Sequence, residues 1–260
     1  MLRIALRLVS TAAATEEPAA PAATEVPTTA PEPTEAEPVV KRGGVLKIGH
    51  EADAADLDPA TSAAASDAMI QDLVYEGLVR WNPESMEVEP LLAKSWEINE
   101  DSTVYTFHLN EGIKFATGRE MTAKDVAWSW LRLKNLQGQP AWLMDGVTAV
   151  EAVDDYTVKV TMGASDASFL AKTSVAYMGP MDSEVAEANG CVTGPEAVDK
   201  DTCKEWLDAN SVGAGPYVLE RWVRDSEIRM LPNPYYWEGT PTFDSVVLKH
   251  VSDATAQAQL

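Results

Sequence analysis

Alternation of hydrophobic and polar positions predicts a series of short strands along the chain. Turn-forming residues at 99–102 and at 154–155 each separate two such runs, which predicts two β-hairpins. The predicted strands are, in chain order, 45–49, 96–98, 103–109, 147–153, 157–162, 217–223, 226–231 and 243–251.

Apolar residues at helical spacing predict helices between these strands. One is expected to begin at Ser66 and Asp67 and to keep its apolar face to Leu78. A second follows Thr122, whose spacing to Asp125 resembles a capping box with Asp in place of Glu. The remaining helices are expected near 181–189, at 195–209, and from Ser252–Asp253 onward. Mixed helices and hairpins indicate an α/β or α+β chain.

The first forty residues differ from the rest. Residues 11–40 consist of nine Ala, six Pro, six Thr, six Glu and three Val. Such a segment has little to bury and is expected to be a disordered tether. Residues 1–10 resemble an export signal, although Arg7 interrupts a short apolar run. Either they are a degenerate signal or they have no targeting role; the tether favours a secreted or surface-anchored protein.

Net charge excludes some partners. With 20 Lys and Arg against 41 Asp and Glu, the chain carries −21. We therefore expect no nucleic-acid partner and no docking on an anionic bilayer surface. Apolar residues make up 45% of the chain, enough for a sizeable core, and none of its apolar runs approaches the length of a membrane span.

Motifs for catalysis or metal binding are scarce. His50, His108 and His250 are far apart in sequence, so we expect no metal site. The chain has no nucleophile elbow, P-loop or dinucleotide fingerprint. Its many carboxylates leave a carboxylate-dependent hydrolase as an alternative function. We expect no cofactor.

Three further residues have two interpretations each. Trp142 follows a Gly-Gln-Pro break and either lines a ligand cleft or plugs its own subdomain. Cys191 and Cys203 form a disulfide if the protein is exported, and are otherwise two free thiols.

Several short segments, taken in their order along nearly all of 41–260, resemble the N-terminal half of the family 5 extracellular solute-binding proteins. These are the peptide- and nickel-type receptors of ABC importers. Asn110, where the family often has Arg or Lys, and Ala214, where Thr is common, are small departures. The matching segments are 43–49, 57–59 (Leu-Asp-Pro), 73–79, 90–97, 105–109, 112–115, 122–126, 150–158, 213–217, 233–237 and 253–255.

The resemblance implies an α/β fold of the type II periplasmic-binding-protein class. By the family pattern, 41 to about 80 and about 180–260 form the main part of the first lobe, and about 81–180 form an inserted subdomain. By the same pattern, the second lobe would follow Leu260, and we expect it to be missing from this chain. The resemblance further implies a monomeric, extracytoplasmic receptor that captures peptides or similar solutes and delivers them to an ABC permease, without chemistry on the ligand.

The family resemblance also carries a binding mode. In peptide receptors of this family, the backbone after Leu-Asp-Pro pairs with the ligand like an added strand. Here this stretch is Ala63, Ala64 and Ala65. The alternative interpretation is that these alanines have no ligand role and only occupy a loop or the start of a helix. A sugar-, nickel- or haem-type receptor with the same fold stays an alternative. Because one lobe offers one wall of a cleft, we expect ligand affinity far below that of a two-lobed receptor.

Overall fold

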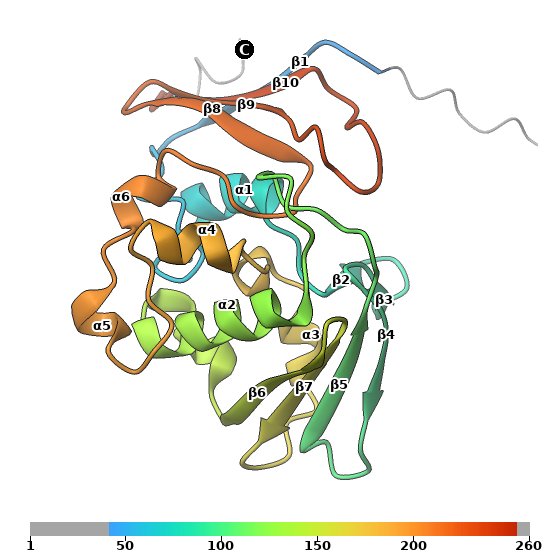
Figure 1. Cartoon of the computed structure of the whole chain (residues 1–260). Coiled ribbons are helices and arrows are strands. Elements are labelled where there is room, and N and C mark those ends of the chain that lie inside the picture. Colours follow the sequence, from blue (N-terminus) through green and yellow to red (C-terminus); the bar gives the residue numbers. More distant parts are fainter. Residues whose placement is uncertain (1–41, 254–260) are drawn as a thin grey trace, which may run out of the picture. The chain divides into compact units, whose positions relative to one another are not determined.

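The computed structural model describes residues 42–253, whose strands form two larger sheets and a hairpin (Figure 1). The mixed sheet has the order β1-β10-β9-β8; β1 and β10 are parallel, and its other neighbours are antiparallel. Its strands are β1 (Val45–His50), β8 (Tyr217–Val223), β9 (Glu227–Pro232) and β10 (Ser245–His250). The antiparallel sheet has the order β4-β5-β7-β6. Its strands are β4 (Ala93–Ile98), β5 (Val104–Leu109), β6 (Val147–Asp154) and β7 (Thr157–Met162), and β2 (Val79–Asn82) pairs with β3 (Glu87–Pro90) in the hairpin.

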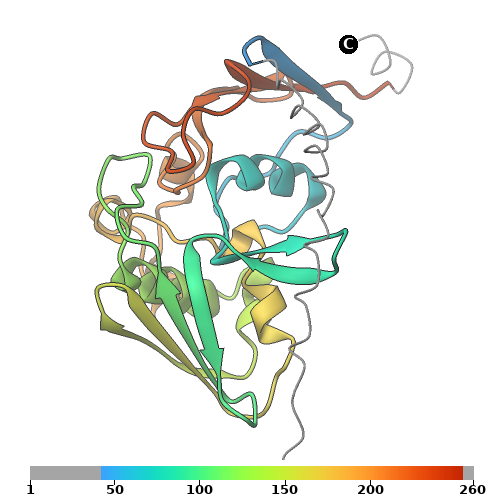
Figure 2. The ribbon, with the colours of Figure 1, turned by 90° about the vertical axis from the view of Figure 1, so that its right-hand side faces the viewer.

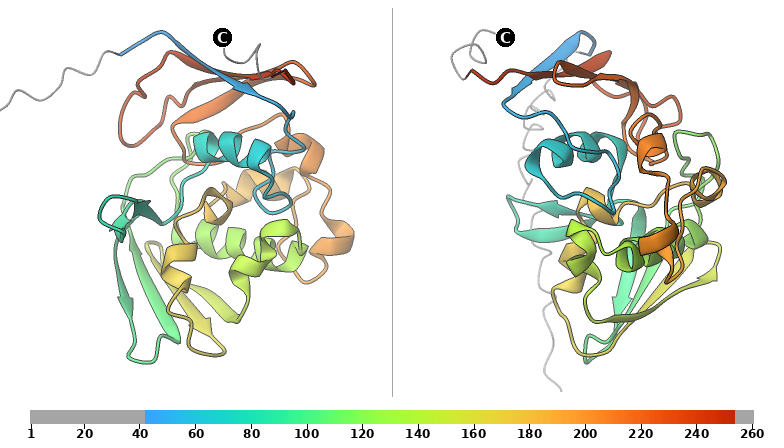
Figure 3. Two further views of the ribbon diagram at one scale, coloured as in Figure 1. Left: turned by 180° about the vertical axis from the view of Figure 1, so that it is seen from behind. Right: turned by 90° about the vertical axis from the view of Figure 1, so that its left-hand side faces the viewer.

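Helices occupy the space between the two larger sheets. From behind, α1 lies beneath the mixed sheet and α2 lies next to the antiparallel sheet (Figure 3). The β2–β3 hairpin lies at a level between the sheets (Figure 2). The helices are α1 (Ala65–Val74), α2 (Ala123–Leu136), α3 (Phe169–Lys172), α4 (Ser183–Ala188), α5 (Ala197–Lys200) and α6 (Lys204–Leu207), with 3₁₀ turns η1 (Gln139–Met144) and η2 (Ala176–Met178).

Both predicted hairpins are confirmed. β4 pairs with β5, and β6 pairs with β7, across the turns expected from the sequence. In the first turn the Asn99 side-chain oxygen accepts hydrogen bonds from the Thr103 and Val104 N–H groups, at 2.9 and 2.8 Å. An Asx residue that bonds the returning strand fixes the turn locally, which is why the sequence could predict it.

Helix α2 joins two hydrophobic cores. Its predicted capping box is confirmed, with Thr122 and Asp125 satisfying each other's backbone. Trp130 is fully buried in the core that covers the antiparallel sheet. Trp128, two residues earlier and on another face of the helix, packs into the core beneath the mixed sheet. One helix therefore anchors both layers, and neither tryptophan is left on the surface.

The first predicted helix is shorter than expected. It begins at Ala65, with Ala64 rather than Ser66 or Asp67 at the N-cap position, and it ends at Val74 instead of continuing to Leu78. The Val74 carbonyl accepts a hydrogen bond from the Gly215 N–H at 2.9 Å. A Cβ atom at Gly213 would lie 2.1 Å from this carbonyl oxygen. A close backbone approach from residue 213 onward therefore stops the helix, and no local signal announces it.

The helix predicted at 195–209 is wrong as one element. It is divided into α5 and α6 by extended backbone at Asp201. The Asp201 carboxylate accepts two hydrogen bonds from Arg132, from Nε at 2.8 Å and from Nη2 at 3.1 Å. This contact spans 69 residues of sequence, so the helical pattern alone could not predict the break.

Arg132 is the centre of a buried ion-pair network. Its side chain is 0% exposed, and its Nη1 and Nη2 donate to both Asp58 oxygens at 2.8 and 2.6 Å. Asp201 takes the remaining edge of the guanidinium, which also contacts Cys203 Sγ at 3.4 Å. Paired carboxylates on both edges satisfy the planar guanidinium and offset its desolvation. The network joins α2 to the segment before α1 and to the segment before α6.

Two sequence predictions lie outside the described residues. They are the degenerate signal and tether at 1–40, and nearly all of the helix expected from Ser252–Asp253 onward. Among the helices of residues 42–253, none has the length and apolar character needed to cross a membrane.

A partly buried carboxyl joins the loop before β2 to the aromatic turn 233–239. Glu76 accepts hydrogen bonds from the Tyr236 hydroxyl at 2.8 Å and from Trp237 Nε1 at 2.9 Å. Burial raises the pKa of Glu76 above its ordinary value, and nearby Glu238 adds to the rise, whereas the two hydrogen bonds oppose it. The folded state therefore holds the Glu76 proton more tightly than the unfolded state does.

Replacing Arg132 by Met should destabilise the fold by about 3–5 kcal/mol, because Asp58 and Asp201 would lose their cation inside the protein. Urea unfolding followed by circular dichroism measures the free energy of unfolding. The matched control is Arg221→Met, which removes an exposed cation paired with Glu227 and should lower the free energy of unfolding far less, because solvent screens a surface pair. Equal losses for the two variants would contradict the central role of Arg132.

The raised pKa of Glu76 predicts that the free energy of unfolding falls as the pH rises above about 4.5, the ordinary pKa of a glutamate. Glu76→Gln does not titrate, so its deficit in unfolding free energy relative to the natural chain should narrow as pH rises. Urea unfolding at several pH values between about 4 and 8 measures this. Glu97→Gln, at a strand glutamate whose side chain is 79% exposed, is the control. A deficit that stays constant with pH would contradict the prediction.

Candidate ligand-binding site

The predicted ligand segment forms an extended approach to α1. Ala64 has φ −66° and ψ 148°, and its carbonyl accepts the N–H groups of Asp67 and Ala68 at 3.0 and 2.9 Å. Its own N–H donates to Ser62 Oγ at 3.3 Å. Both backbone polar groups of Ala64 are therefore used within the protein. Of the three alanines proposed for ligand pairing, Ala64 is the one already satisfied.

Ala63 and Ala65 differ from Ala64 in their backbone partners. The Ala63 N–H donates to Gln139 Oε1 at 3.0 Å. Within the part of the chain that the structure describes, no donor reaches the Ala63 carbonyl. Ala65 is exposed and is the first residue of α1, where an N–H has no partner within the helix. The Ala63 carbonyl and the Ala65 N–H thus have no hydrogen bond within residues 42–253.

Asp58 holds the approach to this segment in place. Its side chain accepts the Ala60 N–H at 2.9 Å, and its carbonyl accepts the Thr61 N–H at 3.2 Å. Arg132 fixes Asp58 from the opposite side. At the start of α1, buried Asp67 accepts hydrogen bonds from the Ser62 hydroxyl and, at 2.7 Å, from the Ala55 N–H. The position of the alanines is thus set by buried carboxylates on both sides.

Gln139 is a site residue that the sequence did not indicate. Its Oε1 accepts the Ala63 N–H at 3.0 Å, and its own N–H donates to the Thr61 carbonyl at 3.1 Å. Gly138 permits this approach, since a Cβ atom there would lie 2.1 Å from the Ala60 carbonyl oxygen. These contacts cross more than 70 residues of sequence, and the Gly-Gln-Pro break was the only available signal.

The structure places Trp142 in η1, on the same short 3₁₀ element as Gln139. Residues three apart on a 3₁₀ helix share a face, so the two side chains lie one above the other. The Trp142 side chain is 57% exposed and borders two hollows. The first has a volume of about 520 Å³ and is lined by polar and apolar groups of 134–147; the second has about 390 Å³ and is mainly apolar.

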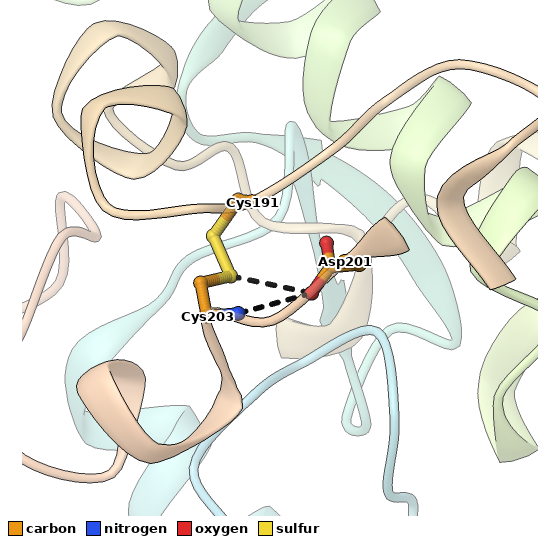
Figure 4. A group of neighbouring side chains, drawn as sticks. All are labelled: Cys191, Asp201 and Cys203. Carbon is orange, nitrogen blue, oxygen red and sulfur yellow. Dashed lines mark hydrogen bonds between the residues drawn. A yellow bond between two sulfur atoms is a disulfide. The ribbon is translucent and has the colours of Figure 1, made fainter. Parts of the chain in front are cut away.

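Cys191 and Cys203 form a disulfide, with Cα atoms 4.9 Å apart (Figure 4). The ligand-forming atoms of both cysteines and Asp201 lie within 4.8 Å of one another. This group is poorly suited to a metal ion, because a disulfide sulfur is no thiolate and Arg132 already neutralises Asp201. The disulfide lies next to the ion-pair network and contributes no atom to the ligand segment.

The histidines are held by local partners. His50 and His250 are paired in register on β1 and β10, and each ring bonds backbone carbonyl oxygens. His108, on β5, lies 3.7 Å from Glu97. The candidate site itself offers backbone groups held in place by Gln139, which suit the recognition of another backbone.

Comparison with known proteins supports a binding role. Residues 87–260 match the sequence model of "Bacterial extracellular solute-binding proteins, family 5 Middle". Heme-binding protein A of Haemophilus influenzae is 32% identical over 71% of this chain and 36% of its own length. The dipeptide-binding protein of Escherichia coli is 32% identical over 76% of this chain and 38% of its own length.

A solved structure of a binding protein is also similar to this chain. The periplasmic binding protein DppA of Helicobacter pylori, in complex with the peptide STSA, superposes with a TM-score of 0.70 at 28% identity. The match covers 84% of this chain and 45% of DppA. The chain thus spans less than half the length of each of these relatives. With its family match, its α/β architecture and its relatives in agreement, the chain belongs to the family 5 bacterial extracellular solute-binding proteins.

Proposed function

We propose that this chain supplies one wall of the solute cleft of an extracytoplasmic receptor for an ABC importer, and that the solute is a peptide. The observation that carries the proposal is the extended segment before α1, where the Ala63 carbonyl and the Ala65 N–H are available to a ligand backbone. Such pairing holds any peptide irrespective of its side chains. Two relatives whose names or titles refer to peptide binding support the same class of solute.

Several narrower statements belong to this proposal. The receptor works as a monomer without a cofactor or enzymatic activity, and it passes its solute to a membrane permease. The main part of the first lobe comprises 41 to about 80 and about 180–260, with about 81–180 inserted. Location outside the cytoplasm agrees with the Cys191–Cys203 disulfide, because such bonds persist in oxidising compartments.

A haem-type receptor is the second candidate, since one relative at 32% identity is a haem-binding protein. Against it, the His50 and His250 rings are bonded to backbone carbonyl oxygens, and His108 lies 3.7 Å from Glu97. The backbone geometry favours the peptide. Sugar and nickel receptors of the same fold, and a hydrolase, have less support from this site.

Ala65→Pro tests the backbone pairing directly. Proline is well tolerated at the first position of a helix, and Ala64 already has the extended conformation that a residue before proline requires. The substitution therefore removes one N–H and leaves the fold intact. We expect the affinity for tri-alanine at millimolar concentration to fall roughly three- to tenfold, the value of one hydrogen bond. Ala65→Ser, which keeps the N–H, should bind like the natural chain.

The measurement is a two-dimensional amide NMR titration of the full chain, with maltose, Ni²⁺ and haemin as comparison solutes. Peptide-dependent shifts at residues 63–65 support the proposal. Shifts there with a comparison solute alone would replace the peptide by that solute class. Loss of the intact peptide during the titration would point to the hydrolase.

A further inference from the structure

The turn after α4 contains the only Asn-Gly dipeptide in the chain, Asn189–Gly190. An asparagine before glycine loses its side-chain amide more readily than other asparagines, because glycine has no side chain to shield its backbone nitrogen. We propose that Asn189 is a deamidation site of this protein, and that the Cys191–Cys203 disulfide holds the reaction back while it is intact. This chemistry is independent of the solute that the chain binds.

The fold needs a glycine at position 190, so it cannot avoid the reactive dipeptide. Asn189 is the C-cap of α4, and Gly190 follows it with φ +94°. The Gly190 N–H donates to the Glu187 carbonyl, and the Cys191 N–H donates to the Ala186 carbonyl, both at 3.1 Å. This pair of hydrogen bonds is the Schellman motif, in which a glycine at positive φ ends the helix.

The reaction joins two groups that meet at this turn. The Gly190 backbone nitrogen attacks Cγ of Asn189, the Cγ–Nδ2 bond breaks, and ammonia leaves with the proton of the Gly190 nitrogen. Water then hydrolyses the succinimide ring at either of its two carbonyls. Hydrolysis at Cγ leaves aspartate, whereas hydrolysis at the main-chain carbonyl leaves isoaspartate, whose main chain is one carbon longer. Either product has a carboxylate in place of a neutral amide.

In the folded state both reacting groups are engaged in hydrogen bonds. Asn189 is exposed to the water that the second step needs, but its Nδ2 donates to the Val185 carbonyl at 2.8 Å. The Gly190 nitrogen is held by its bond to the Glu187 carbonyl. The last turn of α4 must therefore open before the nitrogen can attack, and the rate of deamidation follows the population of the opened turn.

The disulfide keeps this turn closed. Cys191 follows Gly190 directly, and its partner Cys203 follows Thr202, whose N–H donates to the Gly190 carbonyl at 3.1 Å. A covalent bond and a hydrogen bond thus join two consecutive pairs of residues. Asp201 accepts the Cys203 N–H at 3.4 Å and holds this side of the turn (Figure 4). Without the disulfide, one hydrogen bond remains between the two pairs, and the turn opens more often.

Isoaspartate at position 189 would make the loss of the disulfide permanent. The Cα atoms of Cys191 and Cys203 are 4.9 Å apart in the intact bond. A disulfide tolerates only a narrow range of Cα separation and direction, and an extra main-chain carbon two residues before Cys191 displaces it. Asn189 thus converts a reversible reduction into a lasting change of the chain.

The test compares the oxidised chain with the double variant Cys191→Ser/Cys203→Ser at mildly alkaline pH. Peptide mass mapping measures the fraction of Asn189 that is converted to a carboxyl over time. We expect conversion about tenfold or more faster in the double variant. A tenfold change corresponds to about 1.4 kcal/mol of easier opening, which is less than a disulfide typically contributes. The natural chain reduced with dithiothreitol is a second comparison and should behave like the double variant.

Asn210 is the matched control within each sample. Its Nδ2 donates to the Trp206 carbonyl at 2.8 Å, as that of Asn189 does to Val185, but a serine follows it. Its conversion should stay slow with and without the disulfide. Asn189→Gln should be converted far more slowly, because the ring that it must form is larger. After dithiothreitol is removed, this variant should regain the disulfide, whereas the natural chain that has formed isoaspartate should not.

Each other result would overturn part or all of the proposal. Equal rates at Asn189 with and without the disulfide would remove the role of the disulfide, and no conversion in any sample would remove the site. Equal acceleration at Asn189 and Asn210 would mean that the whole fold has opened, which contradicts control by a local turn. Full recovery of the disulfide in chains that contain isoaspartate would contradict the permanent change.

Discussion

The buried guanidinium of Arg132 is the constraint on which the rest of the structure depends. It pairs with Asp58 and Asp201, which lie 74 and 69 residues away in sequence. Because each carboxylate would be costly to bury alone, neither segment can move without exposing the cation or leaving it unpaired. Asp58 in turn shapes the turn before the alanine segment, so the geometry of the candidate ligand wall depends on an ion-pair network behind it. The disulfide beside Asp201 ties the same segment covalently.

Local signals in the sequence were sufficient for much of the fold. The Asn99 turn and the Thr122–Asp125 capping box are satisfied within a few residues, and both were predicted correctly. Predictions failed where a distant partner decides the backbone. Gly215 ends α1, Arg132 divides α5 from α6, and the four-residue strands β2 and β3 are too short for a clear alternating pattern. Resemblance to a family supplied the two-lobed context, which no periodicity contains.

The candidate site likewise has parts that the local sequence indicates and parts that depend on distant residues. The alanines and Trp142 could be named from the sequence. The alanines follow the Leu-Asp-Pro motif of the family, and Trp142 follows the Gly-Gln-Pro sequence that interrupts the helical pattern. Their relation to each other could not, since it depends on Gln139 reaching Ala63 across 76 residues and on Gly138 permitting the approach. The structure also separates the alanines by their partners: both backbone groups of Ala64 and the N–H of Ala63 are bonded within the protein, whereas the Ala63 carbonyl and the Ala65 N–H have no hydrogen bond within residues 42–253. A site made largely of backbone atoms leaves little trace in side-chain chemistry.

The parallel pairing of β1 with β10 has a mechanical consequence. Val45 lies opposite Ser245 and His50 lies opposite His250, so the chain enters this strand pair at one end and leaves it at the other. A pulling force applied at the start of β1 and at the end of β10 would act along the two strands. It would stress all of their mutual hydrogen bonds at the same time, in shear. Antiparallel neighbours pulled from one end would instead open bond by bond. The mixed sheet is thus built to resist tension between whatever precedes β1 and whatever follows β10.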